Sequence, residues 1–328
     1  MDRMRAALLE QVEQPLRIAE IDRPIPREGE VLVRVKASGV NPLDLKIRAG
    51  KAAHAKHPLP AILGIDLAGE IEELGPDVTA FRRGDAVFGM TGGVGGVPGS
   101  LGTYAAVDAR LLAQWPSNLS MREAAALPLI FITAWEGLIH QADLAAKRSV
   151  LILGGAGGVG HMAIQIARAS GATVFATASA AQAGFIRSLG ATPIDRAQPV
   201  ESLVPEHTHG KGFDVVYDTI GGTGLDLAFQ AVARRGHVVS CLGWGTHALA
   251  PLSFKAASYS GVFTLLPLLT GEGREHHGAI LREAARLAEG GALLPRVDPR
   301  VFSLDEVEAA HRLVAEHKAE GKVVVTVG

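Results

Sequence analysis

The chain has 328 residues, of which 48% are hydrophobic and 20% are charged, and its formal net charge is -2. This length and composition predict two domains with buried cores and exclude extensive disorder. The small net charge and the lack of a basic block argue against nucleic acid or an acidic membrane surface as the main partner. The single cysteine, Cys241, excludes an internal disulfide and any multi-cysteine metal site.

The N-terminal residues carry charges instead of an apolar block, so the sequence predicts no secretory signal. The longest apolar run near the C-terminus, 261–269, is far shorter than the ~20 residues that cross a bilayer. We therefore expect a cytoplasmic protein without a membrane partner.

The first third of the sequence has the alternation that is typical of β-strands. In residues 31–37, apolar side chains alternate with mostly polar ones, and shorter strands are expected at 68–71 and 85–88. Residues 91–102 are rich in glycine, and we interpret them as a mobile surface loop. Ser120 starts a capping-box pattern, which predicts that a helix begins there.

Strands and helices alternate from residue 149 onward. The sequence predicts strands at 149–153, 173–177, 213–218 and 237–242, with helices at 158–170 and 185–189. Continuous apolar strands separated by amphipathic helices are typical of a parallel sheet covered on both faces. The C-terminal part is expected to contain a helix at 274–289, a second helix after the capping box at 303–306, and a strand at 322–327.

A glycine-rich turn joins the first predicted strand and helix of this middle region. The turn reads GGAGGVG, and its Gly155, Gly157 and Gly160 fit the spacing G-x-G-x-x-G. This spacing permits a tight turn, a close approach of the backbone to a pyrophosphate, and tight helix–strand packing. We predict that the loop, including Gly158 and Val159, binds a dinucleotide through backbone N–H groups at the helix N-terminus.

The second strand of this region indicates which dinucleotide is bound. NAD-dependent proteins place Asp or Glu about 20 residues after the loop, where it binds the ribose 2′-hydroxyl. Residues 175–180 read FATASA and contain no carboxylate, and the next acid is Asp195. Ser179 offers a hydroxyl, although no Lys or Arg follows at once, since Arg187 lies further along the helix. We expect NADPH, with NADH less favoured.

Further motifs follow one another along nearly the whole chain. They are NPLDLKIRAG at 41–50, PAILGIDLAG at 60–69, GDAV at 84–87, ALP at 126–128, TAW at 133–135, FDVVYD at 213–218 and GKVV at 321–324. Together they resemble the zinc-independent quinone oxidoreductase branch of the medium-chain dehydrogenase/reductase (MDR) superfamily. The resemblance implies an α/β protein with a GroES-like β-rich substrate domain (1–122 and 268–328) and a Rossmann doubly wound parallel-sheet domain (123–267). It also suggests a homodimer.

The positions that bind zinc in the zinc alcohol dehydrogenases of this superfamily lack zinc ligands here. Asn41 replaces their Cys, and Ile65 and Asp66 replace their His-Glu pair. The loop at 91–102 contains no Cys, so the four-Cys structural zinc lobe is missing as well. We predict no metal site and interpret the paired histidines as solvated side chains: His207 with His209, and His276 with His277.

Without a metal, the oxyanion that develops when a conjugated carbonyl compound accepts a hydride needs another partner. Many quinone reductases of the family have Tyr where this chain has Lys46, and enone-reducing relatives have Lys. Lys46 is therefore a candidate catalytic residue, whose ammonium would hydrogen-bond the nicotinamide ribose or the developing oxyanion, with the proton coming from Lys46 or water. An ordinary surface lysine is the alternative. The resemblance also implies that Asn41 contacts the substrate or the nicotinamide, and we expect Asp44 to cap the turn.

The resemblance implies the remaining cofactor contacts position by position. Thr133 would lie near the nicotinamide, Ser179 at the 2′-phosphate, and Lys322 near the phosphates or the cleft. The other expected contacts are Leu242 and Gly243 at the end of a sheet strand, and Phe263, whose backbone would hold the carboxamide. We interpret Cys241 as a small buried residue, and Trp244 as either lining the substrate cleft or packing.

The sequence leaves three activities open. The expected one is hydride transfer from NADPH to a quinone or an α,β-unsaturated carbonyl compound without zinc. A 2-enoyl thioester reductase would require a basic patch for the phosphates of coenzyme A, and no clear one is visible. A dinucleotide-binding protein without turnover, of the crystallin or sensor type, is the third.

Overall fold

The computed structural model describes residues 2–328, which form two compact units. Unit 1 comprises Met1–Leu129 and Leu265–Gly328, and unit 2 comprises Ile130–Thr264. The chain therefore leaves unit 1, forms unit 2, and returns. The predicted division after residue 122 lies seven residues before the observed one, which follows Leu129. The predicted division after residue 267 lies three residues after the observed one, which follows Thr264. The first division falls within helix α3 (Pro128–Trp135), which begins in one unit and continues into the other.

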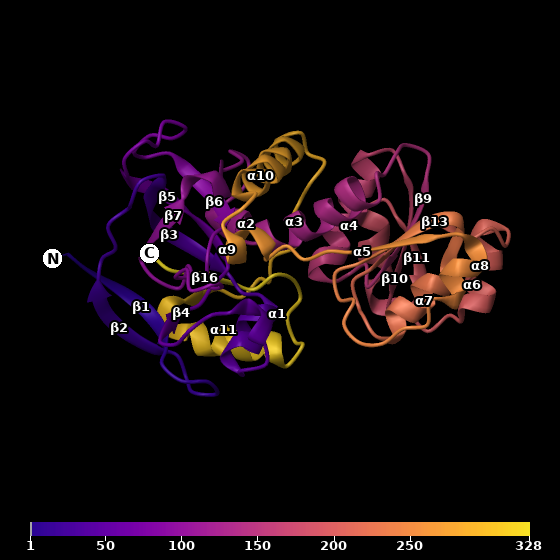
Figure 1. Ribbon diagram of the computed structural model, residues 1–328, viewed down its shortest axis with the longest axis horizontal. Helices are drawn as coiled ribbons and strands as arrows, with labels where there is room; N and C mark the ends of the chain where they lie inside the picture. The colour runs from indigo at the N-terminus through magenta and orange to yellow at the C-terminus, as the bar shows by residue number, and fades with distance from the viewer. Residues whose placement is uncertain (1) are drawn as a thin grey trace. The chain divides into compact units, whose positions relative to one another are not determined.

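Unit 1 is built from mostly antiparallel strands, as its alternating sequence predicts (Figure 1). One sheet has the order β15-β16-β3-β5-β6-β8 with β7 paired to β3, and a smaller sheet has the order β2-β1-β4. The strands are β1 (Arg3–Leu9), β2 (Arg17–Asp22), β3 (Glu30–Gly39), β4 (Ala61–Ile62), β5 (Asp66–Leu74), β6 (Ala86–Met90), β7 (Tyr104–Asp108), β8 (Leu112–Gln114), β15 (Phe302–Ser303) and β16 (Val324–Thr326).

Short helices connect these strands and two longer helices follow unit 2 in the chain. The capping box at Ser120 is confirmed, because Ser120 N–H donates to Glu123 at 2.8 Å and Glu123 N–H donates back to the Ser120 hydroxyl at 3.3 Å. The helices are α1 (Pro42–Arg48), η1 (Ala53–Ala55), η2 (Ala109–Leu111), α2 (Met121–Ala125), α9 (Leu266–Thr270), α10 (Arg274–Glu289), η5 (Leu304–Glu306) and α11 (Val307–Ala315).

Unit 2 contains a six-stranded parallel sheet in the order β11-β10-β9-β12-β13-β14. With the strands counted along the chain, this is the order 3-2-1-4-5-6 of a Rossmann domain, so the predicted doubly wound parallel sheet is confirmed. The strands are β9 (Ser149–Leu153), β10 (Thr173–Ala178), β11 (Thr192–Asp195), β12 (Phe213–Asp218), β13 (Val232–Ser240) and β14 (Ser258–Gly261).

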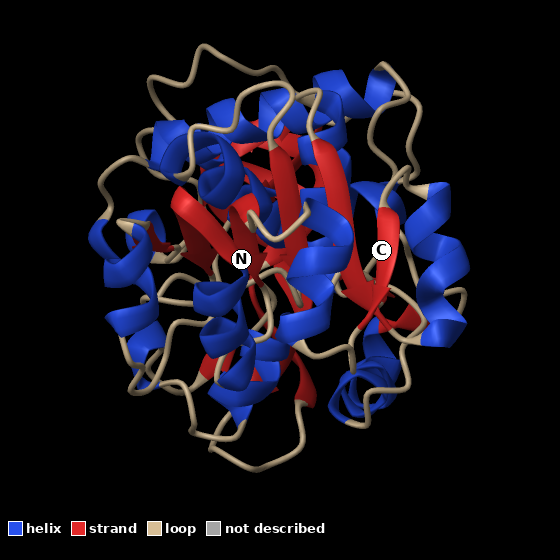
Figure 2. Ribbon diagram, turned by 90° about the vertical axis from the view of Figure 1, so that its right-hand side faces the viewer, coloured by secondary structure: helices blue, strands red, loops and turns tan. Residues whose placement is uncertain are grey.

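Helices flank this sheet (Figure 2). Apolar side chains of β9, β12 and β13, such as Leu151, Val216 and Val238, form a core with those of α7. None of the helices in residues 2–328 has the length and apolar character needed to cross a bilayer. The helices are η3 (Glu136–Gln141, a π-helix that follows α3), α4 (Gly158–Ala169), η4 (Ala180–Gln182), α5 (Ala183–Ser188), α6 (Val200–Thr208), α7 (Thr223–Ala231) and α8 (Ala250–Lys255).

The interpretation of residues 91–102 as an exposed loop was wrong, because most of this segment is buried in unit 1. Its glycines permit close backbone packing instead of mobility. A Cβ at Gly92 would lie 2.1 Å from the Pro98 carbonyl oxygen, and one at Gly99 would lie 2.2 Å from that of Leu63. The loop also carries Ser100, whose hydroxyl donates to the Asp66 carbonyl at 2.7 Å.

Candidate functional site

Except for Thr133, the predicted cofactor residues of unit 2 follow the carboxyl ends of the parallel strands. The glycine loop follows β9, Ser179 follows β10, Leu242 and Gly243 follow β13, and Phe263 follows β14. In open parallel sheets, ligands bind at this edge where the strand order reverses. The order reverses between β9 and β12, so the glycine loop borders that point.

The loop contains buried glycines and exposed glycines, and the two kinds do different things. Gly155 and Gly160 are buried, and a Cβ on them would lie 2.6 Å from the Ala176 side chain and 2.1 Å from the Gly154 carbonyl oxygen. Gly157 and Gly158 are exposed at the start of α4. The first N–H groups of a helix have no partner within it, so this surface offers backbone donors to an anion. The loop fits a pyrophosphate.

Two threonines that the sequence did not single out hold the glycine loop in place. Gly154 N–H donates to the Thr177 hydroxyl at 3.0 Å, and Gly155 N–H donates to the Thr177 carbonyl at 2.9 Å. The Thr219 hydroxyl donates to the Leu153 carbonyl at 2.6 Å. The sequence offered a signal for them: a hydroxyl residue stands at the end of β10 and of β12, the two strands beside β9.

Asp218, at the end of β12, organises the adjoining strand ends. Its carboxylate is fully buried and accepts hydrogen bonds from the Ile220 N–H at 2.9 Å, the Gly221 N–H at 3.0 Å and the Ser240 hydroxyl at 2.7 Å. The Ser240 oxygen in turn accepts from the Leu242 N–H at 3.0 Å. The sequence showed Asp218 only as part of a motif, although an acid that ends an apolar strand is itself a signal.

The end of β10 carries Ser179, whose hydroxyl bonds to Gln182 at 3.0 Å. Sequence reasoning missed a cation beside it. Arg196 follows β11, and its backbone N–H donates to the Ala178 carbonyl at 3.0 Å, which places this exposed arginine next to the end of β10. The carboxylate of Asp195 accepts from the Ala197 N–H at 2.9 Å. Arg196 was missed because it follows the neighbouring strand.

The ends of β13 and β14 bring three predicted cofactor residues together, namely Leu242, Gly243 and Phe263. Val262 N–H donates to the Ser240 carbonyl at 2.9 Å, so Leu242 and Gly243 lie near Phe263. The Phe263 ring meets Trp244 edge-on with centroids 6.3 Å apart, and both rings are exposed. Cys241 is partly buried, and burial raises the pKa of its thiol to about 12. The neutral thiol is a poor nucleophile.

Thr133 lies on α3, which passes beside the glycine loop. A Cβ on Gly158 would lie 3.2 Å from the Ile130 side chain of this helix. Thr133 is almost fully buried, and its carbonyl accepts a hydrogen bond from the Tyr217 hydroxyl at 2.6 Å. The predicted nicotinamide residue is therefore close to the predicted pyrophosphate site.

In unit 1, Asn41, Asp66 and Lys322 form a buried polar cluster. The Lys322 ammonium donates to Asp66 Oδ2 at 3.0 Å and to Asn41 Oδ1, and Asn41 Nδ2 donates to Asp66 Oδ2 at 2.9 Å. Asp66 Oδ1 accepts from the Leu129 N–H at 2.8 Å. The side chains of Asn41 and Lys322 are thus engaged with each other and with Asp66, and their roles toward substrate and cofactor stay predictions.

This cluster does not fit a zinc ion. The ammonium that contacts Asp66 repels a divalent cation, and an amide replaces the thiolate or imidazole that zinc prefers. The only cysteine, Cys241, belongs to unit 2. The donor set around Asp66 therefore binds a side-chain cation instead.

Asp44 caps α1, as predicted. Its carboxylate accepts from the Asn41 N–H at 2.7 Å and from the Gly64 N–H at 3.3 Å. Complete burial raises the pKa of Asp44 to about 7, against the opposing effect of the Asn41 N–H, and the charge of Asp66 raises it further. Lys46 lies on the exposed side of the same helix.

A cavity of about 560 Å³ opens beside α1 in unit 1. Its size is within the range of small-molecule sites. Most of its walls are apolar, and Lys56 and His57 are its polar lining residues.

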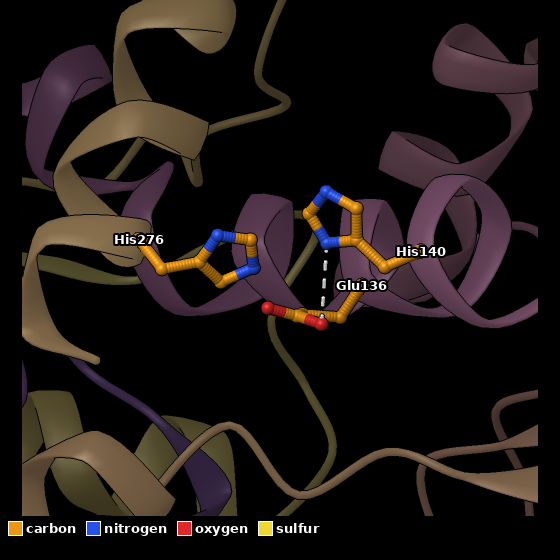
Figure 3. Close-up of side chains that lie close together, drawn as sticks. All are labelled: Glu136, His140 and His276. Atoms are coloured by element: carbon orange, nitrogen blue, oxygen red, sulfur yellow. Dashed lines mark ion pairs between the residues drawn. The ribbon is translucent and has the colours of Figure 1, made fainter. Parts of the chain in front are cut away.

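The interpretation of the paired histidines as solvated was wrong for His277, which is buried because α10 packs against β8 and η2 within unit 1. Burial lowers the pKa of His277 to about 4. His207 is partly buried, and its ring packs against that of Phe175 at an angle of 54°, with ring centroids 5.6 Å apart. In unit 2, His140 forms an ion pair with Glu136 at 3.3 Å within η3 (Figure 3); the third side chain drawn there, His276, belongs to α10 of unit 1.

Two protein families match this chain. The alcohol dehydrogenase GroES-like domain matches residues 27–117, and the zinc-binding dehydrogenase family matches residues 189–325. The 2-methylene-furan-3-one reductase of Solanum lycopersicum is 36% identical over 310 residues, which cover 92% of this chain and 73% of that protein. The chloroplastic NADPH-dependent alkenal/one oxidoreductase of Arabidopsis thaliana is 35% identical over the same shares of both chains.

Solved structures agree with these matches. An alcohol dehydrogenase superfamily protein from Novosphingobium aromaticivorans is 57% identical with a TM-score of 0.98, covering 99% of this chain and all of that one. The quinone oxidoreductase from Coxiella burnetii is 29% identical with a TM-score of 0.85 over the whole of both chains. The chain therefore belongs to the medium-chain dehydrogenase/reductase superfamily of oxidoreductases.

Proposed function

We propose that this oxidoreductase transfers a hydride from NADPH to a small α,β-unsaturated carbonyl compound or quinone, without zinc. The observation that carries the proposal is the open backbone surface at Gly157 and Gly158, in a chain whose relatives are a furanone reductase and an alkenal/one oxidoreductase. An exposed turn at a helix N-terminus holds the pyrophosphate by its N–H groups.

The preference for NADPH rests on the residues at the end of β10. Ser179 offers a hydroxyl and Arg196 a guanidinium to the 2′-phosphate, and Asp195 directs its carboxylate to its own turn. Charge-assisted hydrogen bonds to a phosphate are among the stronger ones in proteins. NADH, which lacks this phosphate, gains nothing from Arg196.

The proposed mechanism does without zinc because the cluster of Asn41, Asp66 and Lys322 already holds a cation: the Lys322 ammonium contacts the Asp66 carboxylate. When bound, NADPH supplies a hydride to the β-carbon of an enone, and negative charge develops on the carbonyl oxygen. Lys46, an exposed ammonium on α1, is the proposed donor to that oxygen. It stabilises the enolate charge by a hydrogen bond to the oxygen, and a proton from Lys46 or from water, added at the α-carbon, completes the saturated ketone.

Steady-state turnover tests this proposal. NADPH and NADH are each assayed with a simple enone, benzoquinone and crotonyl-CoA. We expect the highest kcat/KM with NADPH and the enone or quinone. Preference for crotonyl-CoA would favour the thioester reductase, and NADPH binding without oxidation by any acceptor would favour the protein without turnover.

The role of Lys46 is tested by Lys46→Ala, with Lys51→Ala as the matched control because Lys51 is also an exposed lysine of the same segment. We expect Lys46→Ala to lower kcat by about 10²-fold, the range for one general acid, with unchanged NADPH affinity. Equal turnover of the two variants would remove Lys46 from the mechanism.

We also propose that the protein forms a homodimer through strand β14. This strand forms one end of the parallel sheet and pairs with β13. A strand at the end of a sheet presents backbone groups that can pair with another chain. Light scattering after gel filtration should give twice the mass of 34.3 kDa; a monomeric mass would contradict the proposal.

A further inference from the structure

Tyr217 is a fully buried side chain in β12 whose hydroxyl reaches helix α3 and also interacts with the thiol of Cys241, the residue after β13. It donates to the Thr133 carbonyl at 2.6 Å. Burial raises the pKa of this phenol well above its usual value. The hydroxyl therefore remains protonated and acts as a hydrogen-bond donor throughout the pH range in which the enzyme would work.

The bond falls where the helix changes type. Helix α3 ends at Trp135, and the π-helix η3 continues from Glu136 to Gln141. At such a change the ladder of backbone hydrogen bonds shifts by one residue, and a carbonyl near the change can accept from a side chain. Tyr217 supplies that donor at Thr133.

Gly137 of η3 makes room for the tyrosine ring. A Cβ at this position would lie 2.6 Å from Cζ and 2.8 Å from the hydroxyl oxygen of Tyr217. The glycine and the tyrosine therefore form a matched pair. The close approach of Gly137 and the hydrogen bond to Thr133 restrict where the hydroxyl can lie, and they connect β12 to Thr133.

Both ends of this connection adjoin the predicted cofactor site. The residue after Tyr217 is Asp218, which organises the ends of β12 and β13, and Ile130 of α3 lies beside Gly158. A displacement of α3 relative to the sheet would move Thr133 relative to the glycine loop. Hydride transfer is sensitive to displacements of this kind, since a misplacement of about 1 Å can cost about 10²-fold in rate.

We propose that Tyr217 is a positioning residue of this reductase: through the Thr133 carbonyl it places Thr133 against the nicotinamide. The inference rests on the proposed function and on the predicted contact of Thr133. Tyr217 itself touches neither cofactor nor acceptor, so it acts on the geometry of transfer and leaves binding of the adenosine half unchanged.

The test compares Tyr217→Phe with Ser170→Ala. The control removes a hydroxyl that also donates to a helix carbonyl of unit 2, that of Ile166 at 3.0 Å. We expect Tyr217→Phe to lower kcat about 10-fold or more, with a change in NADPH affinity below about twofold. If product release limits the wild type, the slower transfer in the variant should also raise the deuterium isotope effect on kcat, measured with NADPH deuterated at both C4 positions. Ser170→Ala should leave kcat and the isotope effect unchanged.

Two further variants keep the test decisive. Gly137→Ala retains the hydroxyl but displaces the ring, and should reproduce the loss of kcat. Thr133→Val removes the hydroxyl that Tyr217 is proposed to place, and should lower kcat at least as much. A Tyr217→Phe enzyme with wild-type kcat and isotope effect overturns the inference, and so does a fully active Thr133→Val enzyme, while the proposed function survives both. Failure of the wild type to oxidise NADPH with any acceptor overturns both.

Discussion

The polar cluster of unit 1 and the glycine loop of unit 2 are built in opposite ways. In the cluster, Asn41, Asp66 and Lys322 are buried side chains that satisfy one another, and one of the three pairs is ionic. In the loop, Gly157 and Gly158 present an exposed backbone without side chains. Loss of a charged partner should therefore affect stability in unit 1, whereas added atoms should affect ligand binding in unit 2.

The largest expected effect is in the buried ion pair. Lys322→Met leaves the Asp66 carboxylate without its cation, and breaking such a buried pair costs about 3–5 kcal/mol of unfolding free energy. The double variant Asp66→Asn, Lys322→Met removes both charges and should recover most of that loss. Urea unfolding of the wild type, the single variant and the double variant measures these changes in the free energy of unfolding. A single variant as stable as the wild type would contradict the account of this cluster.

A pH effect should also belong to unit 1, which contains the buried His277 and His311. Burial lowers the pKa of each from 6.5 to about 4, and for His311 the nearby Arg48 adds to the shift while Glu308 opposes it. Their stabilising contribution is fully present above pH 6.5. Because the unfolded chain binds protons on these histidines at a higher pH than the folded protein does, this contribution to the free energy of unfolding decreases as the pH falls from 6.5 to about 4. The loss is about 3 kcal/mol for each histidine.

His311→Leu tests this effect, because neither ring nitrogen of His311 has a hydrogen-bond partner within residues 2–328. Replacement by an apolar residue should stabilise unit 1 and reduce the loss of stability between pH 7 and pH 5. Urea midpoints at the two pH values measure it, with His317→Asn as an exposed control. An unchanged pH dependence in His311→Leu would exclude His311 as its source.

In unit 2, Arg196→Gln should affect affinity and not stability. The loss of a charged hydrogen bond to phosphate, about 1.5–3 kcal/mol, corresponds to an increase in Kd for NADPH of about 10–100-fold. NADH binding should not change. Calorimetry with both dinucleotides checks the prediction, and an equal loss for NADH would show that Arg196 does not read the 2′-phosphate.

The smallest expected effect concerns the open glycine. A Cβ on Gly157 meets only the Gly154 carbonyl oxygen, at 3.2 Å, so Gly157→Ala should leave the unfolding free energy within about 1 kcal/mol. It should still weaken NADPH binding by about 10-fold, because the methyl group would occupy the proposed position of the pyrophosphate. Gly184→Ala, at an exposed position of α5 with no atom within 4 Å, is the control.

The sequence predicted the parallel sheet and its glycine loop well because their signals are local. Strand 213–218 and helix 274–289 match the structure to the residue, since each has a regular apolar pattern. Strand β13 begins at Val232 instead of 237, because its first half carries Arg234 and Arg235, which hide the apolar pattern. The cluster could not be predicted, since Asp66 and Lys322 are 256 residues apart.

Residues 91–102 show a second limit of sequence reasoning. Glycine-rich composition is compatible with an exposed, mobile loop and with close backbone packing. Only the close approach of Leu63 and Gly64 to this segment decides between the two. Arg196 illustrates a third, because its proximity to Ser179 depends on the pairing of β10 with β11.

The most direct test of the central claim is hydride transfer by protein that has been treated with a chelator and shown by elemental analysis to hold no zinc. With NADPH deuterated at both C4 positions and a simple enone, we predict that this protein retains full activity and that deuterium appears at the β-carbon of the saturated ketone. Activity that disappears with chelation and returns with zinc, or a product without deuterium at that carbon, would contradict the account.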